Sequence, residues 1–350
     1  MLVASPSRQS ASRRLNVAIV GATGAVGGEL IDCMDRRAFP VADLRLFASP
    51  RSAGRMIERR GGPVRIEALA DRCFAGVDVA FFAAGADISR RYVPQAVEQG
   101  SLVVDNSSAF RMEPATPLVV PEVNGGRLDA RPSLVANPNC VAAIAVMALA
   151  PLHVRNPIRR VIGATYQAAS GAGAAAMAEL RDSTAAALAG EPFAPRVLPH
   201  PYGFNLFSHN APIDPETGYN GEETKVMAEI RKILDAPGLR ISFTCVRVPV
   251  PRAHSMALTV ECDRPVSVSD VEAWLGDAPG VRLVNDAAAN HFPMPVEASG
   301  RDEVLVGRIR RDASDPDGRT VSLFVAGDQL LKGAALNAVQ IAERVLLGRR

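Results

Sequence analysis

The stretch at 17–30 reads VAIVGATGAVGGEL, in which an apolar run meets three glycines and then a helix-forming sequence. Gly21, Gly24 and Gly27 lie between an expected strand at 15–20 and an expected helix at 27–37. Glycines at these positions permit a tight turn and let the backbone approach a pyrophosphate at the helix N-terminus. The spacing is GxxGxxG rather than GxGxxG, so its place between strand and helix carries the prediction of a dinucleotide-binding loop.

The first 140 residues alternate short apolar runs with helical stretches. After the strand at 15–20, further strands are expected at 43–49, 78–85 and 101–108. The runs are almost continuously apolar, which is typical of parallel strands buried on both faces. The pattern predicts an α/β domain of the Rossmann type.

The pattern changes after Cys140. Long alternating runs at 239–250, 255–262, 304–312 and 320–327 are typical of an antiparallel or mixed sheet with one covered face. Helices are expected at 173–190, 221–234 and 331–348. A second domain of the α+β class therefore follows the first.

Composition and charge exclude several functions. The 350 residues carry a formal net charge of +2, so neither a nucleic acid nor a membrane surface is an expected partner. No apolar segment approaches the roughly 20 residues of a membrane helix. The five cysteines include no CxxC pair, which argues against a metal site and for a reducing compartment. We expect residues 1–14, rich in Ser and Arg, to be a flexible extension, and the cytoplasm to be the location.

The loop after the second expected strand indicates which dinucleotide binds. It reads FASPRSAGR at 47–55 and contains no acidic residue. An NAD site usually offers Asp or Glu here, whereas an NADP site offers Arg. Arg51 can pair with a 2′-phosphate, and Ser52 adds a hydroxyl group. The loop therefore predicts NADP.

Cys140 ends the motif NPNC at 137–140 and begins the apolar run at 141–153. Unpaired N–H groups and the helix dipole at a helix start favour a thiolate. We predict that Cys140 is a nucleophile and that, of the five cysteines, it alone has a depressed pKa. A nicotinamide cofactor together with a nucleophilic cysteine indicates chemistry through a thioester.

Charged residues that suit an anionic substrate occur in three other segments. Arg247 and His254 lie seven residues apart on an expected hairpin-like pair of strands. Arg111 follows a strand and two serines, as a phosphate ligand can. Glu222 and Lys225 lie one helical turn apart and share a face. Taken singly, each of these residues is as typical of an ordinary structural or surface position.

The chain resembles the aspartate-β-semialdehyde dehydrogenase family from about Leu15 almost to the C-terminus. The motifs that carry the resemblance are GATGAVG, SPRSAGR, DNSSAFRM, VVPEVN, NPNC, YQAASGAG, FNLFSHN, GYNGEETK, TCVRVPVPRAHS, GRIRRD and DQLLKGAALNAVQIA. The resemblance implies an NADP-binding domain at 15–139, with 329–350 returning to it, and a catalytic and dimerisation domain at 140–328. It also implies a homodimer or a dimer of dimers.

The implied activity is the NADPH-dependent reductive dephosphorylation of L-aspartyl-4-phosphate to L-aspartate 4-semialdehyde. This step leads toward lysine, threonine, methionine and diaminopimelate. By resemblance, Cys140 would be the thioester nucleophile with Asn139 beside it, Gln167 would orient the thioacyl group, and His254 would be the acid/base.

The resemblance also assigns binding residues. Arg247 and Glu222 would hold the α-carboxylate and α-amino groups of the substrate, and Arg111 and Lys225 its phosphate. The residues implied for the cofactor, with those of the glycine loop, are Gly21, Thr23, Gly24, Ala25, Val26, Gly27, Arg51, Ser52, Ser170, Gly171 and Gln329. Pro50 stands where relatives often have a small residue, and the extension before Leu15 has no counterpart.

Two alternatives stay open. N-acetyl-γ-glutamyl-phosphate reductase shares the thioester chemistry, but its family has NPGC where this chain has NPNC. Glu222 also suits a free α-ammonium group better than an N-acetyl group. A non-catalytic NADP-binding paralogue would not need Cys140 and His254 together.

Overall fold

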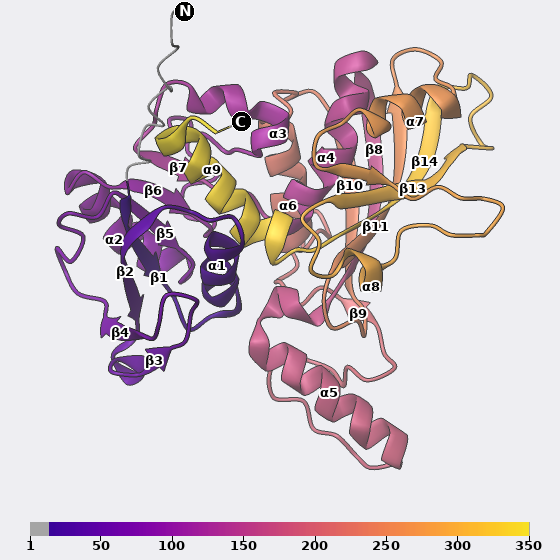
Figure 1. Cartoon of the computed structure of the whole chain (residues 1–350). Coiled ribbons are helices and arrows are strands. Elements are labelled where there is room, and N and C mark those ends of the chain that lie inside the picture. Colours follow the sequence, from indigo (N-terminus) through magenta and orange to yellow (C-terminus); the bar gives the residue numbers. More distant parts are fainter. Residues whose placement is uncertain (1–13, 350) are drawn as a thin grey trace, which may run out of the picture.

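The computed structural model describes residues 14–349, which form two sheets flanked by helices (Figure 1). The expected extension at 1–14 lies outside the described residues, apart from Arg14. The first sheet has the strand order β3-β4-β2-β1-β5-β6-β7, and all of its pairs are parallel except β3–β4. Its strands are β1 (Leu15–Val20), β2 (Val41–Ala48), β3 (Met56–Ile57), β4 (Val64–Ala68), β5 (Val79–Phe82), β6 (Leu102–Asp105) and β7 (Leu134–Ala136).

Helices cover both faces of this sheet, as expected for buried parallel strands. The helix α1 (Ala25–Arg36) follows the glycine loop, and α2 (Ala86–Glu98) and the short α3 (Pro121–Asn124) come later. The C-terminal helix α9 (Leu336–Leu347) returns from the other end of the chain and packs beside α1 (Figure 1). The predicted return of the C-terminal helix to the first domain is confirmed.

The second sheet is mixed, with the strand order β12-β13-β14-β11-β8-β10-β9. Its strands are β8 (Ile158–Gln167), β9 (Phe207–Ser208), β10 (Arg240–Arg247), β11 (His254–Cys262), β12 (Val281–Leu283), β13 (Val304–Arg311) and β14 (Thr320–Gly327). The α/β domain followed by an α+β domain is the predicted fold class. The strand β8 was missing from the expectations, because its glycine and two arginines weaken the apolar pattern.

The predicted hairpin of Arg247 and His254 is wrong. The strand β8 lies between β10 and β11, parallel to β10 and antiparallel to β11. The connecting segment crosses the end of β8, where Val250 and Pro251 accept hydrogen bonds from the amides of Ala169 and Ser170. A six-residue link in the sequence therefore spans a third strand.

The helix α4 (Cys140–Arg155) packs on one face of the second sheet. Every residue from Val141 to Leu152 except Pro151 is buried, which is typical of a helix that is apolar all round. The other helices of this domain are α5 (Ala174–Ala189), α6 (Gly221–Ile233), α7 (Val268–Gly276) and α8 (Pro295–Ala298). The opposite face of the sheet leaves Ile162 and Tyr166 47% and 38% exposed. The sheet therefore has one buried face and one open face.

Candidate active site

Three strand ends bring predicted site residues to one edge of the second sheet. Gln167 ends β8 and pairs in register with Arg247, which ends the parallel strand β10. The antiparallel strand β11 begins at His254, so its start lies at the same edge. All three side chains are buried. They come together because the carboxyl ends of parallel strands share an edge with the amino end of an antiparallel neighbour.

Cys140 is the first residue of α4, as predicted. Asn139 is the N-cap, and its Oδ1 accepts hydrogen bonds from the backbone N–H groups of Val141 (2.9 Å) and Ala142 (3.3 Å). A Cβ on Gly333 would lie 2.8 Å from Cys140 Cβ, so this glycine permits the close approach of the π-helical turn at 331–335. Cys140 is held between a capped helix start and a second segment of backbone.

The predicted depression of the Cys140 pKa is wrong. Loss of hydration, together with the negative charge of Glu222, raises the pKa of Cys140 to about 12. The positive charges of Arg111 and Arg247 act in the opposite direction but are outweighed. A helix start gives only a fraction of a unit charge, whereas burial acts on the full charge of a thiolate.

Arg247 has unsatisfied donors that face the site. Its Nη2 lies 2.9 Å from Nε2 of His209, whereas its Nε and Nη1 are buried and have no hydrogen-bond partner within residues 14–349. A Cβ on Gly171 would lie 3.2 Å from this Nη1. A guanidinium with unpaired buried donors is suited to an anion such as a carboxylate.

His254 is held by a backbone donor. The amide of Ala168 donates a 3.0 Å hydrogen bond to His254 Nδ1, so the neutral ring carries its proton on Nε2. This Nε2 is buried without a partner in the described part of the chain, and a Cβ on Gly171 would lie 2.9 Å from it. Burial, followed by the charge of Arg247, lowers the pKa of His254 well below its usual value. The ring therefore presents an N–H donor to the site.

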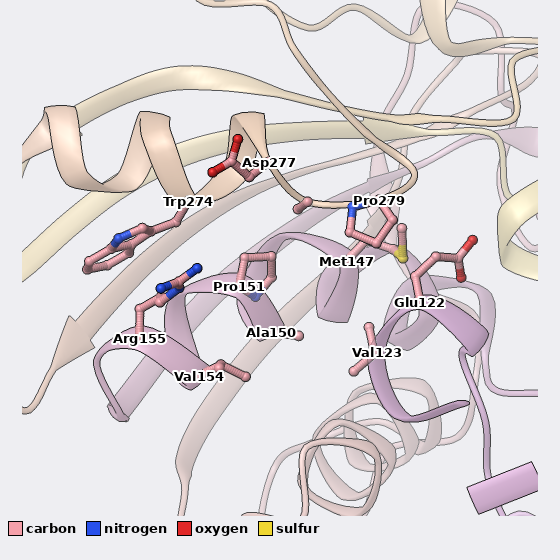
Figure 2. A pocket seen from close by; sticks show the side chains of 11 residues that line it. Glu122, Val123, Met147, Ala150, Pro151, Val154, Arg155, Trp274, Asp277 and Pro279 are labelled. Atoms are coloured by element: carbon pink, nitrogen blue, oxygen red, sulfur yellow. The ribbon is translucent and has the colours of Figure 1, made fainter. Parts of the chain in front are cut away.

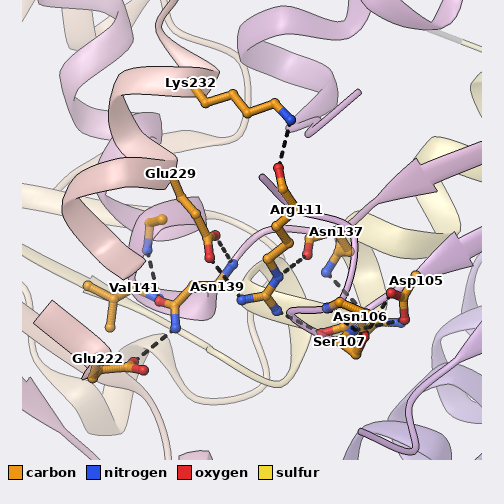
Figure 3. Close-up of polar contacts among 12 residues, drawn as sticks. Asp105, Asn106, Ser107, Arg111, Asn137, Asn139, Val141, Glu222, Glu229 and Lys232 are labelled. Atoms are coloured by element: carbon orange, nitrogen blue, oxygen red, sulfur yellow. Dashed lines mark hydrogen bonds and ion pairs between the residues drawn. The ribbon is translucent and has the colours of Figure 1, made fainter. Parts of the chain in front are cut away.

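The helix α6 supplies carboxylates that contact Asn139, the residue before Cys140 (Figure 3). Glu222 accepts a 2.9 Å hydrogen bond from Asn139 Nδ2. Glu229 accepts a 2.5 Å hydrogen bond from the Asn139 backbone amide and pairs with Arg111 at 3.1 Å. Arg111 also donates from Nε to Asn137 O (2.9 Å) and from Nη2 to Asn106 O (2.7 Å). Cys140, Asn139, Arg111 and Glu222 are thus in one connected cluster.

The two other predicted site residues, Gln167 and Lys225, have fewer contacts that fix their side chains. Gln167 donates from Nε2 to the hydroxyl of Thr165 at 3.3 Å, a contact within its own strand. Lys225 is exposed on α6, one turn beyond Glu222, and its positive charge helps to lower the pKa of His209. Within residues 14–349 neither has a hydrogen bond to Cys140, and the roles of all these site residues stay predictions.

The backbone of the glycine loop closely approaches other backbone atoms at two of its glycines. Gly21 has φ of 90°, and a Cβ there would lie 2.5 Å from Ala83 O. A Cβ on Gly27 would lie 2.4 Å from Gly21 O. A cavity of about 510 Å³ opens beside the loop and is lined by Val20, Gly21, Thr23, Gly24, Ala48, Ser49, Pro50, Leu69, Ala83, Ala84, Ile88 and Tyr92. The loop and this cavity fit a dinucleotide.

The other predicted cofactor residues lie in three groups. Arg51 and Ser52 follow β2 in a short 3₁₀ turn, next to the cavity-lining Ser49 and Pro50, and Arg51 is exposed. Ala25 and Val26 begin α1. Ser170 and Gly171 lie just after β8, and the Ser170 hydroxyl accepts a short hydrogen bond from Gln329 Nε2. Gln329 also accepts from the amide of Ala253 at 3.0 Å, which ties this group to the residue before His254.

A second cavity, of about 210 Å³, lies farther along α4 (Figure 2). Met147, Ala150 and Pro151 of α4 form its floor, with Trp274 on one side and Glu122 at one end. None of the predicted site residues lines it, so it is not part of the candidate active site.

Sequence reasoning did not single out five residues that hold the site. His209 contacts Arg247, and Glu229 contacts Arg111. Arg252 pairs with Glu29 of α1 and with the buried Asp328, both at 2.6 Å, and so links the two domains close to His254. Glu229 had a usable signal, because it follows Glu222 by seven residues, two helical turns on the same face. His209, Arg252 and Asp328 lie in the motifs FNLFSHN, TCVRVPVPRAHS and DQLLKGAALNAVQIA, but those motifs by themselves do not indicate the partners of these residues.

Two family models match this chain. The semialdehyde dehydrogenase NAD binding domain matches residues 16–131, and the semialdehyde dehydrogenase dimerisation domain matches residues 149–332. Together with the two-sheet fold and the cysteine at a helix start, these matches define a two-domain semialdehyde dehydrogenase.

Comparison with individual relatives shows to which family of semialdehyde dehydrogenases the chain belongs. Aspartate-semialdehyde dehydrogenase from Synechocystis is 49% identical over 94% of this chain and 96% of its own length. The Bacillus subtilis protein of the same name is 41% identical over 95% and 97%. The crystal structure of aspartate semialdehyde dehydrogenase II from Vibrio cholerae, complexed with ASA, has a TM-score of 0.91 and 38% identity, covering 96% of this chain and 99% of that one. The chain belongs to the aspartate-semialdehyde dehydrogenase family of oxidoreductases.

The matches also bear on the cofactor and on assembly. The first domain is an NAD(P)-binding domain, and the second is of a kind that mediates dimerisation. In residues 14–349 no helix has both the length and the apolar character needed to cross a membrane.

Proposed function

We propose that the chain catalyses the NADPH-dependent reductive dephosphorylation of L-aspartyl-4-phosphate to L-aspartate 4-semialdehyde, through a thioester on Cys140, in the biosynthesis of lysine, threonine, methionine and diaminopimelate. One observation carries the proposal. Within residues 14–349, Arg247 and His254 have buried donor atoms without partners that lie close together beside Gly171, and the charge of Arg247 acts on Cys140 at the start of α4. Buried donors without partners cost free energy, and an anionic acyl substrate satisfies them.

The charges at the site suit aspartyl phosphate. Arg247 binds the α-carboxylate through the two nitrogens that lack partners, and Glu222 binds the α-ammonium group. Within residues 14–349, Arg111 uses three of its five N–H groups, and it binds the phosphate with Lys225 through the other two. An N-acetylated substrate would leave the carboxylate of Glu222 without a cation, which favours the free amino acid derivative.

The cofactor site suits NADPH, which supplies a hydride when it is bound. Gly21, Gly24 and Gly27, with Thr23, Ala25 and Val26, hold the pyrophosphate at the start of α1. Arg51 and Ser52 bind the 2′-phosphate. Ser170, Gly171 and Gln329 lie beside His254 and bind the nicotinamide end.

Cys140 acts as the nucleophile and loses its thiol proton as the sulfur attacks. Its sulfur attacks the acyl carbon, the bond from carbon to the phosphate oxygen breaks, and the thiol proton leaves with the phosphate. His254 donates a hydrogen bond from Nε2 to the carbonyl oxygen as negative charge develops there, the first part of its acid/base role. Gln167 orients the thioacyl group, and Asn139 holds the start of α4.

The open face of the second sheet supports a homodimer. Ile162 and Tyr166 are exposed there, and the ring of Tyr166 lies 6.0 Å from that of Phe324. A second copy of the chain covers this apolar face. Light scattering on Tyr166→Glu tests the assembly: a monomer is expected, and an unchanged oligomer places the interface elsewhere.

The five free cysteines support the cytoplasm as the location of the protein, because thiols stay reduced there.

The decisive assay is NADP⁺ reduction by purified protein in the reverse direction. We expect phosphate-dependent reduction with aspartate semialdehyde and at least a hundredfold lower kcat/KM with N-acetylglutamate semialdehyde, because a missing charged partner costs about 3 kcal/mol. The reverse preference would identify the reductase of the acetylated substrate. Absence of turnover with both aldehydes, together with tight NADPH binding, would identify the non-catalytic paralogue.

A further inference from the structure

Glu229 is a buried carboxylate with two separate partners. Its side chain is only 2% exposed and lies on the face of α6 that packs toward Asn139 and Arg111 (Figure 3). One oxygen, Oε1, pairs with Arg111 Nη1 at 3.1 Å, and the other, Oε2, accepts from the backbone amide of Asn139 at 2.5 Å. A single carboxylate therefore contacts both the proposed phosphate ligand and the residue before the nucleophile.

The same helix holds the surrounding backbone. Glu222 binds the side-chain amide of Asn139, so α6 grips this residue by both its backbone and its side chain. Lys232, one turn beyond Glu229, donates to the carbonyl oxygens of Arg111, Glu113 and Thr116 at 2.7–3.0 Å. The Arg111 loop and the start of α4 are thus both fixed to α6.

We propose that Glu229 is a positioning residue that couples phosphate binding to the placement of Cys140. It holds the Arg111 guanidinium in the orientation that receives phosphate, and with the same carboxylate it fixes the amide that precedes the thiol. The proposal deepens the proposed function, since it rests on Arg111 as a phosphate ligand.

The carboxylate is needed because both partners are donors. In Glu229→Gln the side chain keeps one acceptor oxygen, and its NH₂ group faces either Arg111 or the Asn139 amide as donor against donor. Glu229→Asp keeps the charge, but it is one methylene shorter and no longer reaches both partners. Either substitution prevents the side chain from satisfying both partners at once, while its volume stays close to that of glutamate.

The first measurement is steady-state kinetics with aspartate semialdehyde, NADP⁺ and inorganic phosphate. We expect Glu229→Gln to raise KM for phosphate about tenfold or more, with KM for NADP⁺ unchanged. The loss of a hydrogen bond to a charged group weakens binding by about this factor. Glu229→Asp should shift KM in the same direction by less. In an Arg111→Met background the rise should vanish, because the carboxylate acts through Arg111.

The second measurement is the rate at which iodoacetamide labels each cysteine, followed by mass spectrometry. Loss of the Asn139 contact should speed labelling of Cys140 severalfold, with Cys245 and Cys262 unchanged. Faster labelling of all three would indicate general loosening and would overturn the proposal. Glu343→Gln is the matched control: Glu343 is also a buried carboxylate paired with arginines, Arg37 and Arg349, but on α9, away from the site.

The outcomes separate the two hypotheses. A folded Glu229→Gln protein with a phosphate KM within twofold of wild type overturns the role of Glu229, as does an equal rise in the Arg111→Met background. Wild-type protein without phosphate-dependent turnover overturns the proposed function instead, and the labelling rates then decide whether Glu229 positions Cys140.

Discussion

Nη2 of Arg247 lies 2.9 Å from Nε2 of His209. The guanidinium always carries its proton and can only donate, so the ring accepts in its neutral form. Burial is the main cause that lowers the pKa of His209 to about 4, and the positive charge of Arg247 adds to it. His209 therefore supports one edge of Arg247 and leaves its other donors for a substrate anion.

The contact between Arg247 and His209 predicts that the folded chain loses stability in acid. The pKa of His209 is lower in the folded chain than its usual value of 6.5, so its stabilising contribution is complete above pH 6.5 and is lost as the pH falls toward 4. The lost free energy of unfolding is at most about 3 kcal/mol. Urea unfolding of His209→Asn between pH 7.5 and 4.5 should show a flatter pH dependence than wild type. His200→Asn, an exposed site, is the control, and an equal flattening there would contradict the prediction.

Cys140 should behave as a neutral thiol in the substrate-free enzyme. Because its pKa is raised to about 12, alkylation by iodoacetamide should quicken steadily from pH 7 to pH 10 without a plateau. Glu222→Gln removes a charge that raises this pKa and should quicken labelling at a fixed pH. Mass-spectrometric labelling rates check both points. A plateau below pH 8 would mean that the thiolate is already formed in the resting site.

Arg51 should determine the choice between the two nicotinamide cofactors. It is exposed beside the loop after β2, where no acidic residue is available to bind a ribose 2′-OH. Arg51→Ala should weaken NADPH relative to NADH by roughly ten- to a hundredfold, the worth of a charge-assisted hydrogen bond. Arg55→Ala, a second exposed arginine in the same loop, is the matched control. Kinetics with both cofactors measure the ratio, and an unchanged ratio in Arg51→Ala would exclude this role.

Replacement by alanine should change the free energy of unfolding in opposite directions at Gly21 and Gly28. Gly21 has φ of 90° and its Cβ would lie 2.5 Å from Ala83 O, so Gly21→Ala should lower the free energy of unfolding by about 2 kcal/mol or more. Gly28 lies inside α1 with nothing within 4 Å of a Cβ, so Gly28→Ala should raise it by up to about 1 kcal/mol. Urea denaturation measures both. Equal effects of the two changes would show that the close approach at Gly21 is relaxed at little cost.

The sequence alone determined the features that depend on neighbouring residues. The glycine loop and strand β1 were predicted from a contiguous stretch, as were the helix start at Cys140 and the helix α6. Each rests on local backbone geometry or on the spacing of apolar residues within one element. The fold class followed from the order of these elements, and the resemblance to a family supplied the candidate site residues.

Only the tertiary structure decided how these residues act on one another. The strand β8 separates Arg247 from His254 in the sheet, and Glu229 meets Arg111 across 118 positions of the chain. Packing of distant segments also decides the direction of the Cys140 pKa shift. A helix start is visible in the sequence and favours a thiolate. The loss of hydration and the charge of Glu222 outweigh that preference, and both arise only when distant segments pack around the thiol.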